Sequence, residues 1–191
     1  AQVLGILAKV FMQQFPPLTA YSLDIFGALV GISAFGILSF IGGVFGSPGA
    51  WFLCAGIISL WLIKEHQKYL TIGAVSVLAM VAIIHNASKD EIWSPYYSIH
   101  VADAAADHSI QLFVNNFFFQ KAVNFRTDTE ARKKYEFPYL LKTPQNVLIL
   151  GAGSGNDVAM AGLRGVPDID AVELDPVIAD IGKKQHPNQP Y

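Results

Sequence analysis

Charged side chains are nearly absent from the first 86 residues of this 191-residue chain and are common in the rest. Only five of the 28 acidic and basic residues fall in that first segment: Lys9, Asp24, Lys64, Glu65 and Lys68. The outer helices of a soluble protein need a polar face, whereas helices in a lipid bilayer do not. The sequence therefore predicts transmembrane helices in residues 1–88, joined to a soluble segment.

Three apolar runs in this segment are predicted to cross the membrane, over residues 20–43, 51–63 and 70–84. A span needs roughly 20 apolar residues, so the second run is short and is expected to borrow neighbouring residues. Residues 1–15 are predicted to be the end of a preceding helix, which stops at Pro16-Pro17. The segment is thus expected to contain about three spans and the end of a preceding helix.

Small and aromatic residues in these runs have spacings typical of membrane helices. Gly27 and Gly31 form a GxxxG pair, which lets helices approach closely in lipid. Trp51 and Trp61 suit the aromatic belts at the membrane surfaces. The alternative, that these runs are buried helices of a soluble protein, conflicts with the near absence of charge.

Residues 89–142 are predicted to form a small β-rich subdomain with a connecting helix. Alternating apolar and polar residues indicate strands over 96–102 and 109–115, joined by a turn that includes Asp103 and Asp107. The carboxylates of this turn either attract a cationic substrate or belong to a solvated loop.

Residues 117–125 are rich in aromatic side chains and are expected to pack this hairpin onto the next domain. Thr127 and Glu130 have the spacing of a capping box, so a helix is predicted from there to about Lys134. Pro138 is expected to break or kink that helix.

The most specific pattern in the chain covers residues 146–176. An apolar run meets the loop Gly151-Ala-Gly153-Ser-Gly155, a helical segment follows, and a second apolar run ends at Glu173. A strand, a glycine turn, a helix and a second strand are typical of the nucleotide-binding half of a Rossmann-like domain. Residues 143–191 are therefore predicted to be the first half of such a domain.

The spacing of the glycines distinguishes between nucleotides. A dinucleotide fingerprint, G-x-G-x-x-G, requires its third glycine at position 156, where the chain has Asn156. The G-x-G-x-G spacing that is present is usual for S-adenosylmethionine (SAM) sites. Glu173 lies about 20 residues beyond the loop, where a carboxylate can accept both ribose hydroxyls. The alternative is a tight turn that binds no ligand.

Polar residues at two predicted helix starts have candidate roles. Asn156 and Asp157 either reach the methionine-derived part of the donor or only cap the helix that they begin. Asp175 is predicted to cap the following helix, in which Pro176 takes the favourable first position.

Net charge, cysteine content and histidine spacing point away from other classes of site. A formal charge of −2 and a pI of about 6.2 give no electrostatic reason to expect nucleic acid. The single cysteine, Cys54, rules out a disulfide framework. No metal site is expected, because no Cys/His pair has ligand spacing and four of the histidines are scattered: His85, His100, His108 and His186.

The order of these segments resembles the spermidine synthase (polyamine aminopropyltransferase) family, above all its bacterial members with an N-terminal transmembrane bundle. Four stretches after the apolar runs carry the resemblance: Ser94-Pro95-Tyr96, Leu112–Asn116 with Gln120, Val147–Gly155 and Ala171–Pro176. In addition, the segment from Tyr21 to Gly31 is similar to a membrane segment of these fused members. Of the four stretches, each matches a part of the family pattern. The first resembles the S-P-Y opening of the family's β subdomain, and the second resembles its L-x-L-D-G-x-x-Q strand. The last two resemble its cofactor motifs.

The resemblance implies a fold, a reaction and a donor. The fold is an α-helical transmembrane segment, then a small β-hairpin subdomain, then an α/β Rossmann-like domain of the SAM-methyltransferase type. The reaction is aminopropyl transfer from decarboxylated SAM to a polyamine, with Gln120 lining the cofactor cleft. The family's catalytic aspartate follows the third strand and would lie beyond Tyr191. The chain also begins with Ala1, in what is predicted to be the end of an apolar helix. It is therefore expected to be a fragment, truncated at both ends and inactive alone.

Three places depart from the family pattern at the amine site. Tyr97 stands where the family has Gln after S-P-Y, and either Asn115 or Asn116 replaces its Asp-Gly pair. Phe137-Pro138 occupies the place of a Tyr-His pair. Two alternatives therefore stay open: a SAM-dependent methyltransferase on the same scaffold, and a non-catalytic membrane protein with a degenerate nucleotide site.

A SAM-type domain is expected to face the cytoplasm, so the chain is predicted to be a multi-pass protein of the inner (cytoplasmic) membrane. This orientation places Lys64 and Lys68 outside if three complete spans precede the domain, which opposes the positive-inside preference. The expected partners are a small-molecule amine or other acceptor, the lipid bilayer and a second copy in a homodimer, with no nucleic acid.

Overall fold

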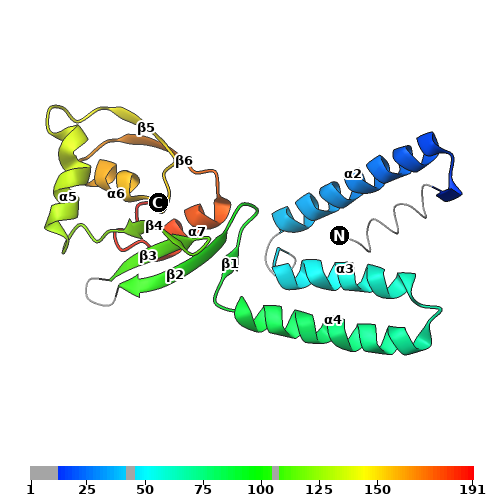
Figure 1. Cartoon of the computed structure of the whole chain (residues 1–191). Coiled ribbons are helices and arrows are strands. Elements are labelled where there is room, and N and C mark those ends of the chain that lie inside the picture. The colour runs from blue at the N-terminus through cyan, green and yellow to red at the C-terminus, as the bar shows by residue number, and fades with distance from the viewer. Residues whose placement is uncertain (1–12, 42–45, 105–107) are drawn as a thin grey trace.

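The computed structural model describes residues 13–41, 46–104 and 108–191 (Figure 1). Most of the helix predicted over residues 1–15 lies outside these ranges, as does Asp107 of the predicted turn. Apolar helices form one end of the molecule, and two small sheets with short helices form the other.

The apolar helices among the described residues are α2 (Pro17–Ile41), α3 (Pro48–Leu62) and α4 (Gln67–Ala87). With 25 and 21 residues, α2 and α4 are about 37 and 32 Å long and are apolar enough to cross a membrane. In their most apolar stretches 6% and 0% of the residues are buried, so they are not core helices. The 15-residue α3 reaches only about 22 Å, so the span predicted over 51–63 is too short.

Close packing between helices occurs at glycines other than the predicted pair. A Cβ placed on Gly56 of α3 would lie 2.5 Å from Val77 of α4, and one on Gly73 would lie 2.9 Å from Leu60. A Cβ on Gly27 or Gly31 would meet no described atom within 4 Å. The antiparallel neighbours α3 and α4 therefore approach closely because each carries a glycine at the contact.

A four-stranded antiparallel sheet follows the helices, in the order β1 (Ile92–Trp93), β2 (Ser98–Ala104), β3 (Ser109–Val114) and β4 (Phe117–Ala122). Only the two middle strands were predicted, and the first of them begins two residues later than expected. Asp103 does not lie in the predicted turn, because it pairs with Ile110 inside the sheet.

The turn between β3 and β4 consists of Asn115 and Asn116, which have φ angles of +51° and +67°. Asparagine tolerates this left-handed region, and two such residues suit a tight hairpin turn. A bulge follows, because Leu112 pairs with Gln120 while Phe113 pairs with Phe118. The bulge leaves Phe119 as the extra residue of β4.

One face of this sheet is covered by α7 (Pro176–Gln185). Ile178 and Ile181 of α7 form a core cluster with four buried sheet residues: Ile99, Ile110, Leu112 and Ala122. Asp175 is the N-cap of α7, as predicted: its side chain accepts from the backbone N–H of Val177 at 2.9 Å.

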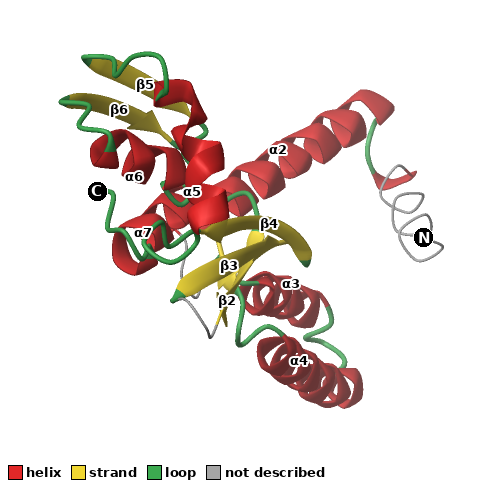
Figure 2. Cartoon of the chain, turned by 90° about the vertical axis from the view of Figure 1, so that its left-hand side faces the viewer, coloured by secondary structure: helices red, strands yellow, loops and turns green. Residues whose placement is uncertain are grey.

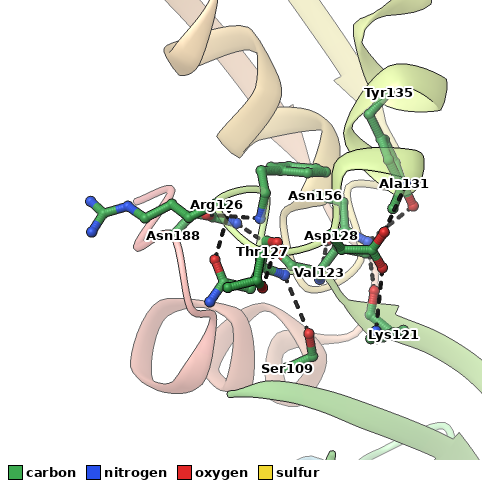
Figure 3. Close-up of polar contacts among 12 residues, drawn as sticks. Ser109, Lys121, Val123, Arg126, Thr127, Asp128, Ala131, Tyr135, Asn156 and Asn188 are labelled. Carbon is green, nitrogen blue, oxygen red and sulfur yellow. Dashed lines mark hydrogen bonds and ion pairs between the residues drawn. The ribbon is translucent and has the colours of Figure 1, made fainter. Parts of the chain in front are cut away.

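A connecting helix, α5 (Thr129–Glu136), leads to the second sheet. Its N-cap is Asp128, which accepts from Ala131 N at 2.9 Å (Figure 3). The N-cap therefore lies one residue after the predicted Thr127, and Ala131 at the third helical position cannot complete a capping box. A short 3₁₀ helix, Phe137–Tyr139, takes over where Pro138 was expected to break the helix.

The second sheet pairs β5 (Asn146–Leu150) with β6 (Asp168–Val172) in parallel, joined by α6 (Asn156–Leu163). Figure 2 shows this β-α-β unit at the end of the molecule away from α3 and α4. Val147 and Ile149 face a buried cluster that includes Met160. Exposed apolar side chains lie along the two strands and just after β6: Leu148, Leu150, Val172 and Leu174.

Candidate functional site

The glycine loop connects the carboxyl end of β5 to α6. The φ angles of Gly151, Gly153 and Gly155 are +70°, +58° and +102°, which residues with a side chain rarely adopt. A Cβ on Gly155 would also lie 2.7 Å from Pro190. The glycine spacing in the sequence is therefore required by the backbone of this loop.

Every backbone N–H from residue 151 to residue 155 has a partner within the chain, at donor–acceptor distances of 2.7 to 3.0 Å. The acceptors are the main-chain oxygens of Val172 and Ala152 and the side chains of Glu173 and Gln120. A phosphate-binding loop instead points unpaired N–H groups at its ligand. This loop is therefore not arranged as a phosphate cradle.

Glu173 lies just beyond the end of β6 and binds the glycine loop through its carboxylate. One carboxylate oxygen accepts from Gly153 N at 2.7 Å, and the other accepts from Asp175 N at 3.0 Å. A carboxylate has about four acceptor positions, so two bonds leave capacity for hydroxyl donors. The half-buried Glu173 is thus fixed in orientation and can still accept from a ligand.

Gln120 reaches the same loop from β4. Its Oε1 accepts from the backbone N–H of Ser154 at 2.8 Å and from the Ser154 hydroxyl at 3.0 Å. A Cβ on Gly153 would collide with that oxygen. The structure therefore brings Gln120, Gly153 and Glu173 together, and it adds the fully buried Ser154, which the sequence reading passed over.

Glu173 also borders a cavity of about 520 Å³. The cavity lies among β6, α6, α7 and the segment that follows α7, and its lining includes Asp170, Lys183 and Tyr191. The Tyr191 ring also approaches Gly155, and Lys183 Nζ lies 5.9 Å from its centre. Burial and then the nearby Glu173 carboxylate raise the pKa of Tyr191, so its hydroxyl stays protonated and can donate a hydrogen bond.

Asn156 is a buried connector and not a surface group of the loop (Figure 3). Its Nδ2 donates to the Lys121 carbonyl at 2.8 Å and to the Tyr135 hydroxyl at 3.0 Å. Its Oδ1 accepts from Val123 N at 2.9 Å and lies 3.1 Å from His186 Nε2. Because both donors and both acceptor positions are in use, the side chain has no hydrogen bond left for a ligand.

Asp157 does not join the Gln120–Glu173 group. It is exposed in the first turn of α6, and its carboxylate raises the pKa values of Tyr135 and Tyr139, in each case as a smaller cause than burial. Desolvation of the carboxyl group raises the pKa of Asp157 itself, against the effect of a bond to its own backbone N–H. The electrostatic effect of Asp157 is therefore on Tyr135 and Tyr139, and not on the Gln120–Glu173 group.

The segment after α7 is held by His186, which is buried at 2% exposure. Its Nδ1 accepts from Asn188 N at 3.1 Å, so the ring is neutral and Nε2–H donates to Asn156. Burial lowers the pKa of His186 from 6.5 to about 4, which keeps it neutral. Asn188 in turn binds the Val123 carbonyl, so this segment is tied to the end of β4.

Local sequence signals could have revealed only some of these residues. Ser154 lies inside the glycine loop, so the motif could have indicated it. In contrast, nothing near His186 or Asn188 in the sequence indicates their partners, which lie 30 and 65 residues away. In the ranges that the structure covers, no three His, Cys, Asp or Glu side chains gather to hold a metal ion.

Comparison with models of known protein families gives no match, and no curated protein matches the chain.

Proposed function

We propose that this protein is a membrane-tethered transferase of the spermidine synthase type, and that the β5–α6–β6 unit begins a Rossmann-like domain that binds an S-adenosyl donor. The observation that carries the proposal is the arrangement of Gly153, Glu173 and Gln120. A positive-φ glycine loop at the carboxyl end of one parallel strand faces a carboxylate just beyond the end of the next. This is where open α/β sheets bind nucleotides.

The hydrogen bonds of the loop support this donor class. Its N–H groups are already paired, which disfavours the pyrophosphate of a dinucleotide. Glu173 keeps acceptor capacity for the two ribose hydroxyls of an adenosine. The amide nitrogen of Gln120 has no partner among the described residues and can donate to the ligand. A nucleoside without phosphates, such as the adenosine of SAM, suits this set.

The proposed reaction is aminopropyl transfer from decarboxylated SAM. The lone pair of an acceptor amine attacks the aminopropyl carbon next to the sulfonium, and a C–N bond forms as the C–S bond breaks. The electron pair of the broken bond goes to sulfur, which leaves as neutral methylthioadenosine. The amine then gives up a proton, so the protein must position the two reactants and provide a base.

Methyl transfer from intact SAM is a second candidate, favoured by the replaced amine-site residues. Tyr97 and Phe137 stand where the family has polar groups, and Phe137 is 73% exposed. The glycine loop and Glu173 would serve either donor equally. The two reactions differ in whether the donor's carboxylate must be accommodated.

We also propose that the soluble part lies in the cytoplasm, with α2 and α4 in the inner membrane. Two helices of sufficient length and apolar composition support the tether. Labelling of single cysteines in residues 108–191 from the outer face of intact cells would contradict this orientation.

Calorimetric titration of the full chain in nanodiscs tests the donor assignment. Decarboxylated SAM, SAM and NAD would be titrated separately. Tighter binding of decarboxylated SAM than of SAM supports aminopropyl transfer, and the reverse order supports methyl transfer. Binding of NAD alone, or of none of the three, would contradict an S-adenosyl donor site.

A further inference from the structure

Three consecutive phenylalanines, Phe117, Phe118 and Phe119, lie exposed on β4, and together we call them the aromatic edge. Their exposed fractions are 78%, 60% and 50%. Within the described sheet β4 pairs only with β3, so no described strand covers its other side. Contiguous exposed apolar side chains of this size mark an interaction surface.

The strand register places the aromatic edge at one particular end of the sheet. Asn115, in the turn just before Phe117, donates from its backbone N–H to the Ser98 carbonyl at 2.8 Å. Ser98 pairs with Trp93 of β1, the strand that follows α4 after only four residues. The start of β4 therefore lies at the end of the sheet that connects to the apolar helices.

Ring contacts tie that end of the sheet to two helix ends. The Tyr96 ring lies 6.1 Å from the ring of Phe40, near the last residue of α2. The Trp93 ring lies 6.2 Å from the ring of Trp51, in the first turn of α3. Figure 1 shows the same junction, with β1 and its loop next to the ends of α2, α3 and α4. The aromatic edge thus starts at about the level where the apolar helices end.

Both faces of the strand carry these rings. Phe118 is on the face of Phe113 and His100, with ring centres of Phe113 and Phe118 5.9 Å apart. Phe117 pairs with Val114 and points to the opposite face, because neighbouring residues of a strand alternate. A protein partner docks on one face or adds to the edge, whereas a surrounding apolar medium suits rings on both faces.

We propose that the aromatic edge inserts into the surface layer of the same bilayer that α2 and α4 cross. This inference rests on the proposed membrane tether. The neighbouring Trp51, Trp93 and Tyr96 are of the residue types that gather at membrane surfaces, and phenylalanine rings extend that belt into the sheet. The edge fixes the sheet, and with it Gln120 on the same strand, at a set height above the lipid.

Quenching by spin-labelled lipid tests this contact. In a Cys54→Ala background, single cysteines would be placed by Phe118→Cys, Ile83→Cys and Leu141→Cys and labelled with a small fluorophore. Ile83 is an exposed residue of α4, and Leu141 is fully exposed in the loop before β5. The full chain would be held in phosphatidylcholine nanodiscs that contain a lipid with a nitroxide near its headgroup.

The proposal predicts that the probe at 118 is quenched about threefold or more strongly than the probe at 141, as a group at the membrane surface would be. Quenching at 83 but not at 118 would overturn the aromatic edge as a lipid contact and leave the tether intact. Quenching at neither position would overturn both. A probe at 118 that is shielded only at high protein concentration and is not quenched by lipid would identify a second copy as the occupant, and would also overturn the proposal.

Discussion

The apolar helices and the sheet-containing part, residues 92–191, form the hydrogen bonds of their polar side chains in opposite ways. In the helices, the hydroxyls of Ser22, Ser59 and Ser76 each donate to the carbonyl four residues earlier, at 2.8 to 2.9 Å. In the sheet-containing part, Asn156 joins residues 21 to 35 positions away. The Ser94 hydroxyl reaches across 81 positions to the Asp175 carboxylate.

The difference is the one expected if the apolar helices lie in lipid, as proposed. Lipid offers no water to an unpaired hydroxyl, so a bond within the same helix satisfies it wherever that helix goes. In the sheet-containing part the long-range bonds join elements that lie far apart in the sequence. Polar side chains are therefore expected to matter little for stability in the helices and greatly around Asn156.

The largest expected effect is that of Asn156→Ala. It leaves Val123 N, the Lys121 carbonyl and the Tyr135 hydroxyl without their partner, at roughly 3–5 kcal/mol in total. Hydrogen–deuterium exchange of α6 should speed up accordingly. Ser76→Ala is the matched change in α4, and exchange of that helix should shift by less than about 0.5 kcal/mol. Equal changes in hydrogen exchange for the two variants would contradict the proposed difference between the two parts.

Acid should lower the stability of the sheet-containing part by protonating His186. Burial lowers its pKa in the folded chain from 6.5 to about 4, so protonation favours the unfolded chain. The stability that this group contributes is complete above pH 6.5 and is lost as the pH falls towards 4. We expect a loss of about 2–3 kcal/mol across that window in urea unfolding. His186→Asn should flatten the pH dependence, and an unchanged profile in that variant would refute the assignment.

A larger side chain should destabilise the packing of α3 against α4 at Gly56 and not at Gly27. Leucine at Gly56 would collide with Val77, whereas a Cβ at Gly27 meets no described atom within 4 Å. Gly56→Leu is expected to destabilise the α3–α4 pair by roughly 1–3 kcal/mol in denaturation by detergent. Gly27→Leu should have no effect on that pair. A reversed order would mean that the GxxxG pair is the contact used inside the chain.

The smallest effect concerns the start of α5. Asp128→Ala removes the side chain that caps the helix and should cost about 1 kcal/mol in urea unfolding. The Thr127 hydroxyl donates to the Asn124 carbonyl and does not cap the helix, so Thr127→Ala should cost less. A larger loss from Thr127→Ala would restore the capping box that the sequence suggested.

The contrast between the two parts also explains how far sequence reading succeeded. Apolar runs located α2 and α4 within a few residues, because composition alone decides whether a helix suits lipid. Asp175 was correctly expected to cap α7, since capping is a local signal. β1 and β4 were missed because two-residue Ile92–Trp93 and the run of three phenylalanines lack the alternation of a half-buried strand.

The residues of the candidate site also differ in whether a local sequence signal or only the folded chain indicates their contacts. The spacing in the sequence correctly predicted that Gly151, Gly153 and Gly155 form a tight loop and that Glu173 follows the next strand, and their binding of a donor stays a prediction. Asn156 was expected at the ligand or as a cap, but its partners on β4, α5 and the segment after α7 come from distant parts of the chain. Only the folded arrangement shows that its hydrogen bonds are all used.

The central claim, that Glu173 and the glycine loop bind the adenosine of an S-adenosyl donor, is tested most directly by donor affinity in Glu173→Ala. Asp128→Ala serves as the control, because it weakens the fold at a site away from the loop. Loss of two hydroxyl bonds to a carboxylate should reduce affinity at least about tenfold in Glu173→Ala. The control should bind as the parent chain does. Equal affinity in the Glu173→Ala variant and the parent would contradict the account.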